Sequence, residues 1–255
     1  MLRAMAQRVQ SLDRALDLLE ALSGADELGV SELAAQTGLV PSTTHRLLGT
    51  LVDRGYAAQN PATGRYLLGY KLLQLTGGLS DRMARLRTAA RPHLEAIQDE
   101  TGETTNLCVL EGRNVVYVDS VSGTRSVRLF TDIGYSIPAH TSGAGKALLA
   151  WRDPVDVETL LGTVPLSAST PRTLTTLPAL QDDLAKIRRR GYSTDNEEHE
   201  LGVGCVATPI LDRAGAPLAA ISVSGPTTRI LHADTADIAG LLREHAEQVA
   251  ATLGP

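Results

Sequence analysis

Residues 30–69 read VSELAAQTGLVPSTTHRLLGTLVDRGYAAQNPATGRYLLG, and this stretch decides the fold of the first part of the chain. Its pattern predicts a short helix, a tight turn at Gly38, a second helix from Pro41 to about Asp53, and two short strands. Gly38 suits the turn because glycine reaches backbone conformations that sharp helix-to-helix turns require. Pro41 suits a first helical turn, where its missing N–H would be unpaired anyway. The combination is typical of a winged helix-turn-helix.

The second predicted helix has a polar face suited to DNA. Leu47, Leu48 and Leu51 are spaced to face inward, which leaves hydroxyl-rich positions predicted to point outward. Such a face, with an arginine, can reach phosphates and base edges in a major groove, although helix pairs also occur as simple packing units. The residues that we predict to contact DNA are Ser42, Thr43, Thr44, His45, Arg46 and Thr50 on this helix and Arg65 on the wing.

Composition limits the classes of protein to which the chain can belong. Its 255 residues and 43% hydrophobic content are ample for about two domains. The formal net charge of −5 argues against non-specific coating of nucleic acid, so DNA affinity must come from a local patch, doubled by dimerisation. Cys108 and Cys205 show neither disulfide nor metal-type spacing. With neither a signal peptide nor an apolar run of membrane-spanning length, we expect a soluble cytoplasmic protein without membrane contact.

Beyond the wing the pattern predicts two helices, at 70–79 and 81–101, separated by the Gly77-Gly78 pair. The periodicity then changes from helical to alternating. Strands are predicted at 104–110, 114–119, 126–130, 192–196, 203–211 and 217–224, and helices at 141–151, 154–161, 177–190 and 232–253. Strands in two groups with helices between them indicate an α+β domain with a mainly antiparallel sheet. The predicted domains are residues 1–69, a linker helix at 70–82, and residues 83–255.

Three stretches in the second domain have the composition of a binding site. PAHTSGAGKALLA at 138–150 places small residues at a helix start, where free backbone N–H groups form a ready anion site. GYSTDNEEHELGVGCVA occupies 191–207, and AAISVSGP occupies 219–226. Ser222 and Ser224 are two residues apart on a predicted strand, so their hydroxyls share one face.

These stretches do not match enzyme motifs. A phosphate-binding loop ending at Lys146 would need glycine at 140 and serine or threonine at 147, where the chain has His140 and Ala147. Glu197 and Glu198 are adjacent on a predicted strand and point to opposite faces, so they are a poor catalytic pair. We therefore expect no enzyme activity, no metal site and no cofactor.

The order of these motifs resembles the IclR family of bacterial transcriptional regulators. The resemblance covers nearly the whole chain, and its specific pieces are SLDRALDLLEAL, PSTTHRLLGTLVDRGY, GRYLLG, HTSGAGKALLA, GYSTDNEEHELGVGCVATPI and AAISVSGP. It implies an N-terminal winged helix-turn-helix, a linker helix and a C-terminal GAF-like effector-binding domain. It also implies homodimers or homotetramers that bind palindromic DNA operators as repressors, activators or both.

Within the family, the effector stretches look most like those of repressors that respond to glyoxylate, pyruvate or allantoin metabolites. That likeness implies that a small carboxylate binds among Gly143, Ala144, Asp195, Cys205, Ser222 and Ser224, with Leu129 and Ile137 closing the pocket. Asp195 fits least well because it would repel an anion, so it either accepts a hydrogen bond from a ligand hydroxyl or orders its loop. Two alternatives stay open: these residues have structural roles only, or the ligand is an aromatic acid or apolar compound.

Overall fold

The computed structural model describes residues 9–231 and 235–254, with side chains throughout except at 79–82. The chain divides into two compact units, Met1–Arg82 and Met83–Pro255. Helix α4 (Lys71–Thr101) contributes residues to both units. Among the described residues, no helix is both long enough and apolar enough to cross a membrane.

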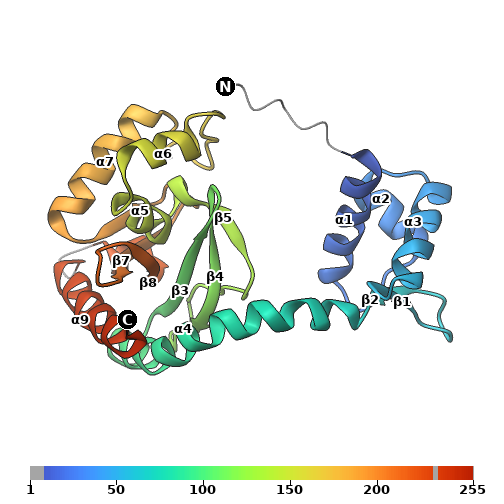
Figure 1. Cartoon of the computed structure of the whole chain (residues 1–255), viewed down its shortest axis with the longest axis horizontal. Coiled ribbons are helices and arrows are strands. Elements are labelled where there is room, and N and C mark those ends of the chain that lie inside the picture. Colours follow the sequence, from blue (N-terminus) through green and yellow to red (C-terminus); the bar gives the residue numbers. More distant parts are fainter. Residues whose placement is uncertain (1–8, 232–234, 255) are drawn as a thin grey trace. The chain divides into compact units, whose positions relative to one another are not determined.

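The N-terminal unit is a winged helix-turn-helix. It consists of α1 (Gln10–Ser23), α2 (Val30–Thr37), α3 (Pro41–Asp53) and the antiparallel pair β1 (Ala57–Gln59) and β2 (Tyr66–Leu68) (Figure 1). Leu28 adds a bridge to Tyr66 beside this pair. Gly38 adopts a φ of 67° between α2 and α3, as the sharp turn requires. The buried core combines Leu18, Leu22, Leu28, Leu33, Leu48, Leu51, Ala57 and Tyr66.

The predicted orientation of Thr44 is wrong. Its side chain is fully buried, and its hydroxyl donates to the carbonyl of Val40 at 3.2 Å. Thr44 lies four residues before Leu48 and seven before Leu51, so it shares their inward face. The other predicted DNA-contacting residues of α3 are exposed or, at Thr43, half-buried: Ser42, Thr43, His45, Arg46 and Thr50.

Helix α4 corrects a second expectation, because the two predicted helices are one helix of 31 residues. The Gly77-Gly78 pair lies inside it and does not end it. Each glycine lowers helix stability by about 1 kcal/mol relative to alanine, yet keeps its N–H for the helical hydrogen bond. A glycine pair without a proline therefore weakens a helix locally and leaves its path unbroken.

The C-terminal unit is built on a six-stranded antiparallel sheet with the order β5-β4-β3-β8-β7-β6. The strands are β3 (Thr104–Glu111), β4 (Asn114–Val121), β5 (Ser136–Pro138), β6 (Ser193–Asn196), β7 (Val203–Leu211) and β8 (Pro217–Pro226). The strand predicted at 126–130 is absent, and that segment has no regular structure. The predicted closing helix is α9 (Thr235–Leu253), which follows the short α8 (Thr227–Ile230); its predicted start at 232–234 lies outside the described residues.

The two faces of this sheet are covered by different helices (Figure 1). On one face, Leu94 of α4 and Leu242 of α9 pack in the core with Val206 and Val223. The other face carries small side chains and packs against α5 (Gly143–Ala150), which follows the short 3-10 helix η1 (Ala139–Thr141). Helices α6 (Pro154–Leu161) and α7 (Leu177–Arg190) complete this layer. The unit therefore has the α+β class predicted from the sequence.

Gly145 should be intolerant of any side chain, because a Cβ there would lie 2.2 Å from the backbone oxygen of Ala139. We expect Gly145→Ala to destabilise the protein by about 3 kcal/mol or more, since the obstacle is backbone that cannot rotate away. Gly240→Ala on α9 is the matched control, because its Cβ would meet nothing within 4 Å. That control should stabilise by about 0.5–1 kcal/mol, as glycine in a helix costs entropy. Urea unfolding followed by circular dichroism would show both shifts; equal midpoints would contradict the close packing.

Candidate ligand-binding site

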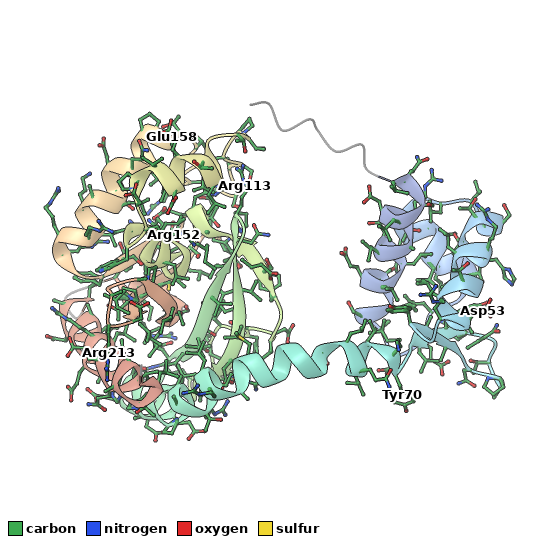
Figure 2. The ribbon with its side chains drawn as sticks, viewed as in Figure 1. Asp53, Tyr70, Arg113, Arg152, Glu158 and Arg213 are labelled. Atoms are coloured by element: carbon green, nitrogen blue, oxygen red, sulfur yellow. The ribbon has the colours of Figure 1, made fainter. Side chains whose placement is uncertain are left out.

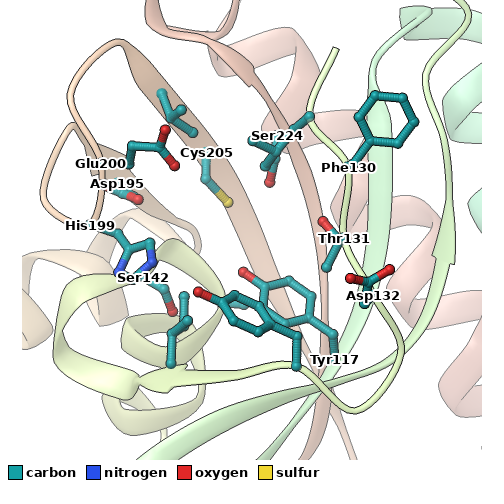
Figure 3. A pocket seen from close by; sticks show the side chains of 15 residues that line it. Tyr117, Phe130, Thr131, Asp132, Ser142, Asp195, His199, Glu200, Cys205 and Ser224 are labelled. Carbon is teal, nitrogen blue, oxygen red and sulfur yellow. The ribbon is translucent and has the colours of Figure 1, made fainter. Parts of the chain in front are cut away.

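A cavity of about 220 Å³ lies where the N-terminus of α5 meets the sheet face of small residues (Figure 3). Strands β4, β6, β7 and β8 and the segment that precedes β5 all contribute to its wall. The lining residues are Tyr117, Leu129, Phe130, Thr131, Asp132, Tyr135, Ile137, Ser142, Ala144, Asp195, His199, Glu200, Val203, Cys205 and Ser224.

The N-terminus of α5 lies close to the sheet because its first residues, Gly143, Ala144 and Gly145, have little or no side chain. The hydroxyl of Ser142 caps the helix by accepting from the amide of Gly145 at 2.9 Å. A Cβ on Gly143 would lie 2.9 Å from the sulfur of Cys205, so only glycine allows this approach. The hydroxyl of Ser193 on β6 donates to the carbonyl of Gly143. The first turn of the helix is thus fixed against β6 and β7.

The structure brings six of the eight sequence-predicted effector residues to the cavity: Leu129, Ile137, Ala144, Asp195, Cys205 and Ser224. Gly143 and Ser222 are not in its wall. Gly143 lies behind it against Cys205, and Ser222 is 1% exposed. The strand register explains the difference between the two serines, because Ser224 lies opposite Cys205 and Ser222 lies opposite Ala207, two residue pairs farther along the strands.

Asn106 on β3 is a polar residue of this site that sequence reasoning missed. Its side-chain amide contacts the hydroxyls of both Ser222 and Ser224 at 3.5 Å, and its oxygen accepts from Ser120 at 2.9 Å. Asn106 is fully buried, and a buried amide needs hydrogen-bond partners, so its contacts orient the hydroxyls of Ser222 and Ser224. Burial raises the pKa of Cys205 to about 11, which keeps the thiol neutral beside these hydroxyls.

Asp195 of β6 is the buried carboxyl group of the cavity, with 4% exposure. Its Oδ1 accepts from the backbone amide of Glu198 at 2.6 Å, which orders the turn after β6. Desolvation by burial raises the pKa of Asp195 to about 7, although the hydrogen bond from the Glu198 amide opposes the shift. The residue therefore orders its loop, as one of the two sequence interpretations stated, while it also borders the cavity.

A buried ion cluster holds the same turn from behind. Lys146 is 2% exposed, and its ammonium contacts the carboxylates of Glu198 at 2.6 Å and Asp183 at 2.9 Å. Burial raises the pKa of Glu198, although the nearby Lys146 charge opposes the shift. Lys146 thus binds two carboxylates of its own chain, which agrees with the absence of a phosphate-loop pattern. Glu197, at the tip of the turn, adopts a φ of 61°.

An aromatic wall was also missing from the sequence prediction. Tyr117 and Tyr135 stack with ring centroids 6.1 Å apart and an interplanar angle of 24°. Phe130 lies at the opening and is 72% exposed (Figure 3). The register that pairs Tyr117 with Cys108 is the signal that places this tyrosine on the cavity side of the sheet. Burial raises the pKa of Tyr117, so its hydroxyl stays neutral and can donate a hydrogen bond.

Among the described residues that line the cavity, three carry carboxyl groups and none is a lysine or an arginine. The carboxyl groups belong to Asp132, Asp195 and Glu200. His199 lies among them, and its Nδ1 is 3.2 Å from the hydroxyl of Thr141. Desolvation lowers the pKa of His199, so the imidazole is neutral at neutral pH. The cavity therefore combines hydroxyls, a thiol and carboxyl groups with apolar walls.

Known proteins share both units of the chain. Residues 11–61 match the IclR helix-turn-helix domain, and residues 81–251 match the bacterial transcriptional regulator IclR C-terminal domain. The acetate operon repressor of Salmonella typhimurium is 38% identical over 97% of this chain and 91% of its own length.

Two solved structures are similar over nearly their whole length. The IclR of Thermotoga maritima has a TM-score of 0.76 at 31% identity, covering 97% of this chain and 100% of its own. An IclR homologue from Microbacterium hydrocarbonoxydans, complexed with 4-hydroxybenzoate, has a TM-score of 0.76 at 28% identity, covering 95% and 98%. The chain therefore belongs to the IclR family of transcriptional regulators, which are DNA-binding proteins and not enzymes.

Proposed function

We propose that this regulator is a repressor of a catabolic operon, released when a small carboxylate enters the cavity at the N-terminus of α5. The observation that carries the proposal is the small cavity in which the hydroxyls of Ser142 and Ser224 and the thiol of Cys205 meet Ala144 at the start of α5. Serine hydroxyls and a helix N-terminus stabilise carboxylate oxygens through charge-assisted hydrogen bonds. The proposed ligand has two to four carbons, with glyoxylate or pyruvate first and an allantoin-pathway acid next. The similarity to a repressor named for the acetate operon supports this class.

Helix α3 is the proposed DNA-reading element. Ser42, His45, Arg46 and Thr50 are exposed on it, and no ion pair of Arg46 is found among the described residues. Arg65 on the wing is different, because its guanidinium pairs with Glu32 at 2.6 Å and donates to the carbonyl of Glu27. A phosphate contact by Arg65 would therefore compete with its bond to Glu32, so Arg46 provides the cleaner test.

Arg46→Ala should weaken operator binding and reduce the slope of log affinity against log salt by about one unit per half-site, because one phosphate contact is lost. The operator would be selected from a random duplex pool, and binding would be measured by fluorescence anisotropy at several salt concentrations. Arg213→Ala removes the same charge from an exposed turn of the C-terminal unit and is the control (Figure 2). Unchanged affinity and slope for Arg46→Ala would remove α3 from the proposed interface.

The N-terminal unit also carries unpartnered apolar side chains, which we assign to contact with a second copy of the chain. Leu12 and Leu16 of α1 are 58% and 48% exposed, and Tyr70 and Leu73 beside the start of α4 are 87% and 69% exposed. Figure 2 shows the Tyr70 side chain projecting from the ribbon. Burial of such side chains provides the main favourable free energy of association. Two reading heads at fixed spacing would then match an inverted-repeat operator.

Light scattering at micromolar concentration should therefore give at least twice the 27.0 kDa chain mass. Leu73→Glu should shift the protein to the monomer, because an ionised carboxylate in an apolar contact is strongly unfavourable. Gln74→Glu introduces the same charge at the next exposed position of α4 and should leave the mass unchanged. A wild-type protein that scatters as a single chain would contradict the assignment.

The effector proposal is tested by two serines on the same strand. Ser224→Ala removes a hydroxyl from the cavity wall and should weaken binding of glyoxylate or pyruvate by about tenfold or more. Ser222→Ala removes a hydroxyl that also contacts Asn106 but lies outside the wall, so its effect should be smaller. Isothermal titration would measure both variants. Equal losses would indicate that the serines act only through the packing of Asn106.

An aromatic acid is the second candidate ligand. The stacked Tyr117 and Tyr135 rings and the apolar side chains of Leu129 and Ile137 favour it, as does the 4-hydroxybenzoate bound by a structural neighbour. Titration of the wild-type protein with glyoxylate, pyruvate, allantoate and benzoate separates the two classes. Tight benzoate binding without binding of the small acids would favour the aromatic ligand.

A further inference from the structure

Among the described residues that line the cavity, an acidic ligand meets carboxyl groups and no lysine or arginine; Arg128 lies outside the wall, over the Phe130 ring. Asp195 is buried in the wall, while Asp132 and Glu200 are exposed at the opening (Figure 3). The lysine nearest to Asp195 in the interior is Lys146, and its ammonium is already bound to Asp183 and Glu198. Two like charges in a cavity of low dielectric are strongly unfavourable, so an anion and an ionised Asp195 cannot share this space without compensation.

Among the described residues around Asp195, the one positive charge is that of Lys146, which is already paired with two carboxylates. The surrounding residues come from the turn after β6, from β7, from β4 and from α5, and they are Glu198, His199, Cys205, Tyr117 and Lys146. The Glu198 charge raises the pKa of Asp195, and the Lys146 charge lowers it. Burial keeps Cys205 and Tyr117 neutral, and His199 is neutral because burial lowers its pKa. The α5 N-terminus and the serine hydroxyls can stabilise the ligand carboxylate, but they leave the charge of an ionised Asp195 in place, and a proton on Asp195 removes it.

The geometry of Asp195 suits it to hold that proton. Its Oδ1 accepts from the amide of Glu198 at 2.6 Å, the backbone of His199 also hydrogen-bonds to the carboxyl group, and the residue lines the cavity. Figure 3 shows its carboxyl group on the same side of the cavity as Cys205 and His199. A protonated carboxyl has one O–H donor and keeps its acceptor oxygen for the loop amide. Burial, which raises the pKa of Asp195 to about 7, makes the protonated form accessible at neutral pH.

We propose that an acidic effector binds together with one proton, which Asp195 takes from the solvent and donates as a hydrogen bond to the ligand carboxylate. The inference rests on the proposed function, because it assumes that the effector is an acid. The ligand enters as an anion and the proton comes from water or buffer, so the complex gains no net charge. Protonated Asp195 then favours ligands that present a hydrogen-bond acceptor to it. A ligand hydroxyl that donates to ionised Asp195 would bind without this proton.

Proton uptake can be measured directly on the wild-type protein. Titration with pyruvate in phosphate and in Tris buffers gives the number of protons from the difference in apparent enthalpy, because the two buffers have different ionisation enthalpies. We expect about half a proton per ligand at pH 7 and close to one at pH 8. The dissociation constant should rise about tenfold between pH 6 and pH 8. Glyoxylate should behave in the same way.

Two variants identify the group that takes up the proton. In Asp195→Asn the amide oxygen can still accept from Glu198, and the amide nitrogen can donate to the ligand at every pH. Its affinity for pyruvate should therefore be nearly independent of pH and buffer. His199→Gln removes the imidazole of the cavity wall, which an anion could also cause to protonate, and proton uptake should persist in it. Operator binding and the melting temperature establish that both variants are folded.

Each outcome has a distinct meaning. Pyruvate or glyoxylate binding without proton uptake would overturn the inference and leave the proposed effector class intact. Proton uptake that disappears in His199→Gln and persists in Asp195→Asn would also overturn it, by assigning the proton to the imidazole. If neither small acid binds to the wild-type protein between pH 5.5 and pH 8, the effector class itself is wrong. Should Asp195→Asn not fold, the buffer and pH dependence of the wild-type protein still decides the question.

Discussion

The close contact between helix α5 and the sheet is the constraint on which the C-terminal unit depends. Gly145 lies against the backbone of Ala139, and Gly143 lies against Cys205, at distances that exclude any Cβ. The sheet face that packs against α5 carries small side chains, among them Ala207 and Ala220. Because protein interiors are packed as densely as crystals, a larger residue on either side would push the helix outward. The cavity is the space that remains where this contact ends, at the first turn of the helix.

The buried ion cluster of Lys146, Asp183 and Glu198 determines which charges are left at the cavity. A lysine as deeply buried as Lys146 requires carboxylate partners, and it finds one on α7 and one in the turn after β6. Glu198 thereby fixes the turn that carries Asp195, whose own carboxyl group also accepts from that turn. The positive charge of Lys146 is neutralised by Asp183 and Glu198, neither of which lines the cavity. The described residues of the cavity wall therefore carry carboxyl groups without a paired lysine or arginine. The proton proposed for Asp195 follows from this separation.

The sequence predicted the architecture better than it predicted the cavity wall. Helical periodicity and turn residues placed α6, α7 and β7 at their observed bounds, and the family resemblance supplied most of the predicted cavity residues. The errors have local causes. Thr44 is polar but lies on the buried face of its helix. The Gly77-Gly78 pair was predicted to end a helix, but α4 continues through it. Tyr117 reaches the cavity through a strand register set by distant residues, which periodicity along one strand cannot reveal.

The outer wall of the cavity differs in kind from its inner wall. Residues 122–135 have no regular structure and are held by single contacts along their length, such as the bond from the Thr104 hydroxyl to the Leu129 carbonyl, the ion pair of Arg125 with Glu103 and the backbone pairing of Tyr117 with Tyr135. Side chains such as Phe130 contact the cavity without belonging to any buried cluster. Substitutions of its exposed side chains, such as Phe130, change the shape and polarity of the opening without disturbing a buried cluster. The preference of such a cavity for one ligand over another can therefore change through a few codons of one surface loop, while the packed layers beneath are inherited unchanged.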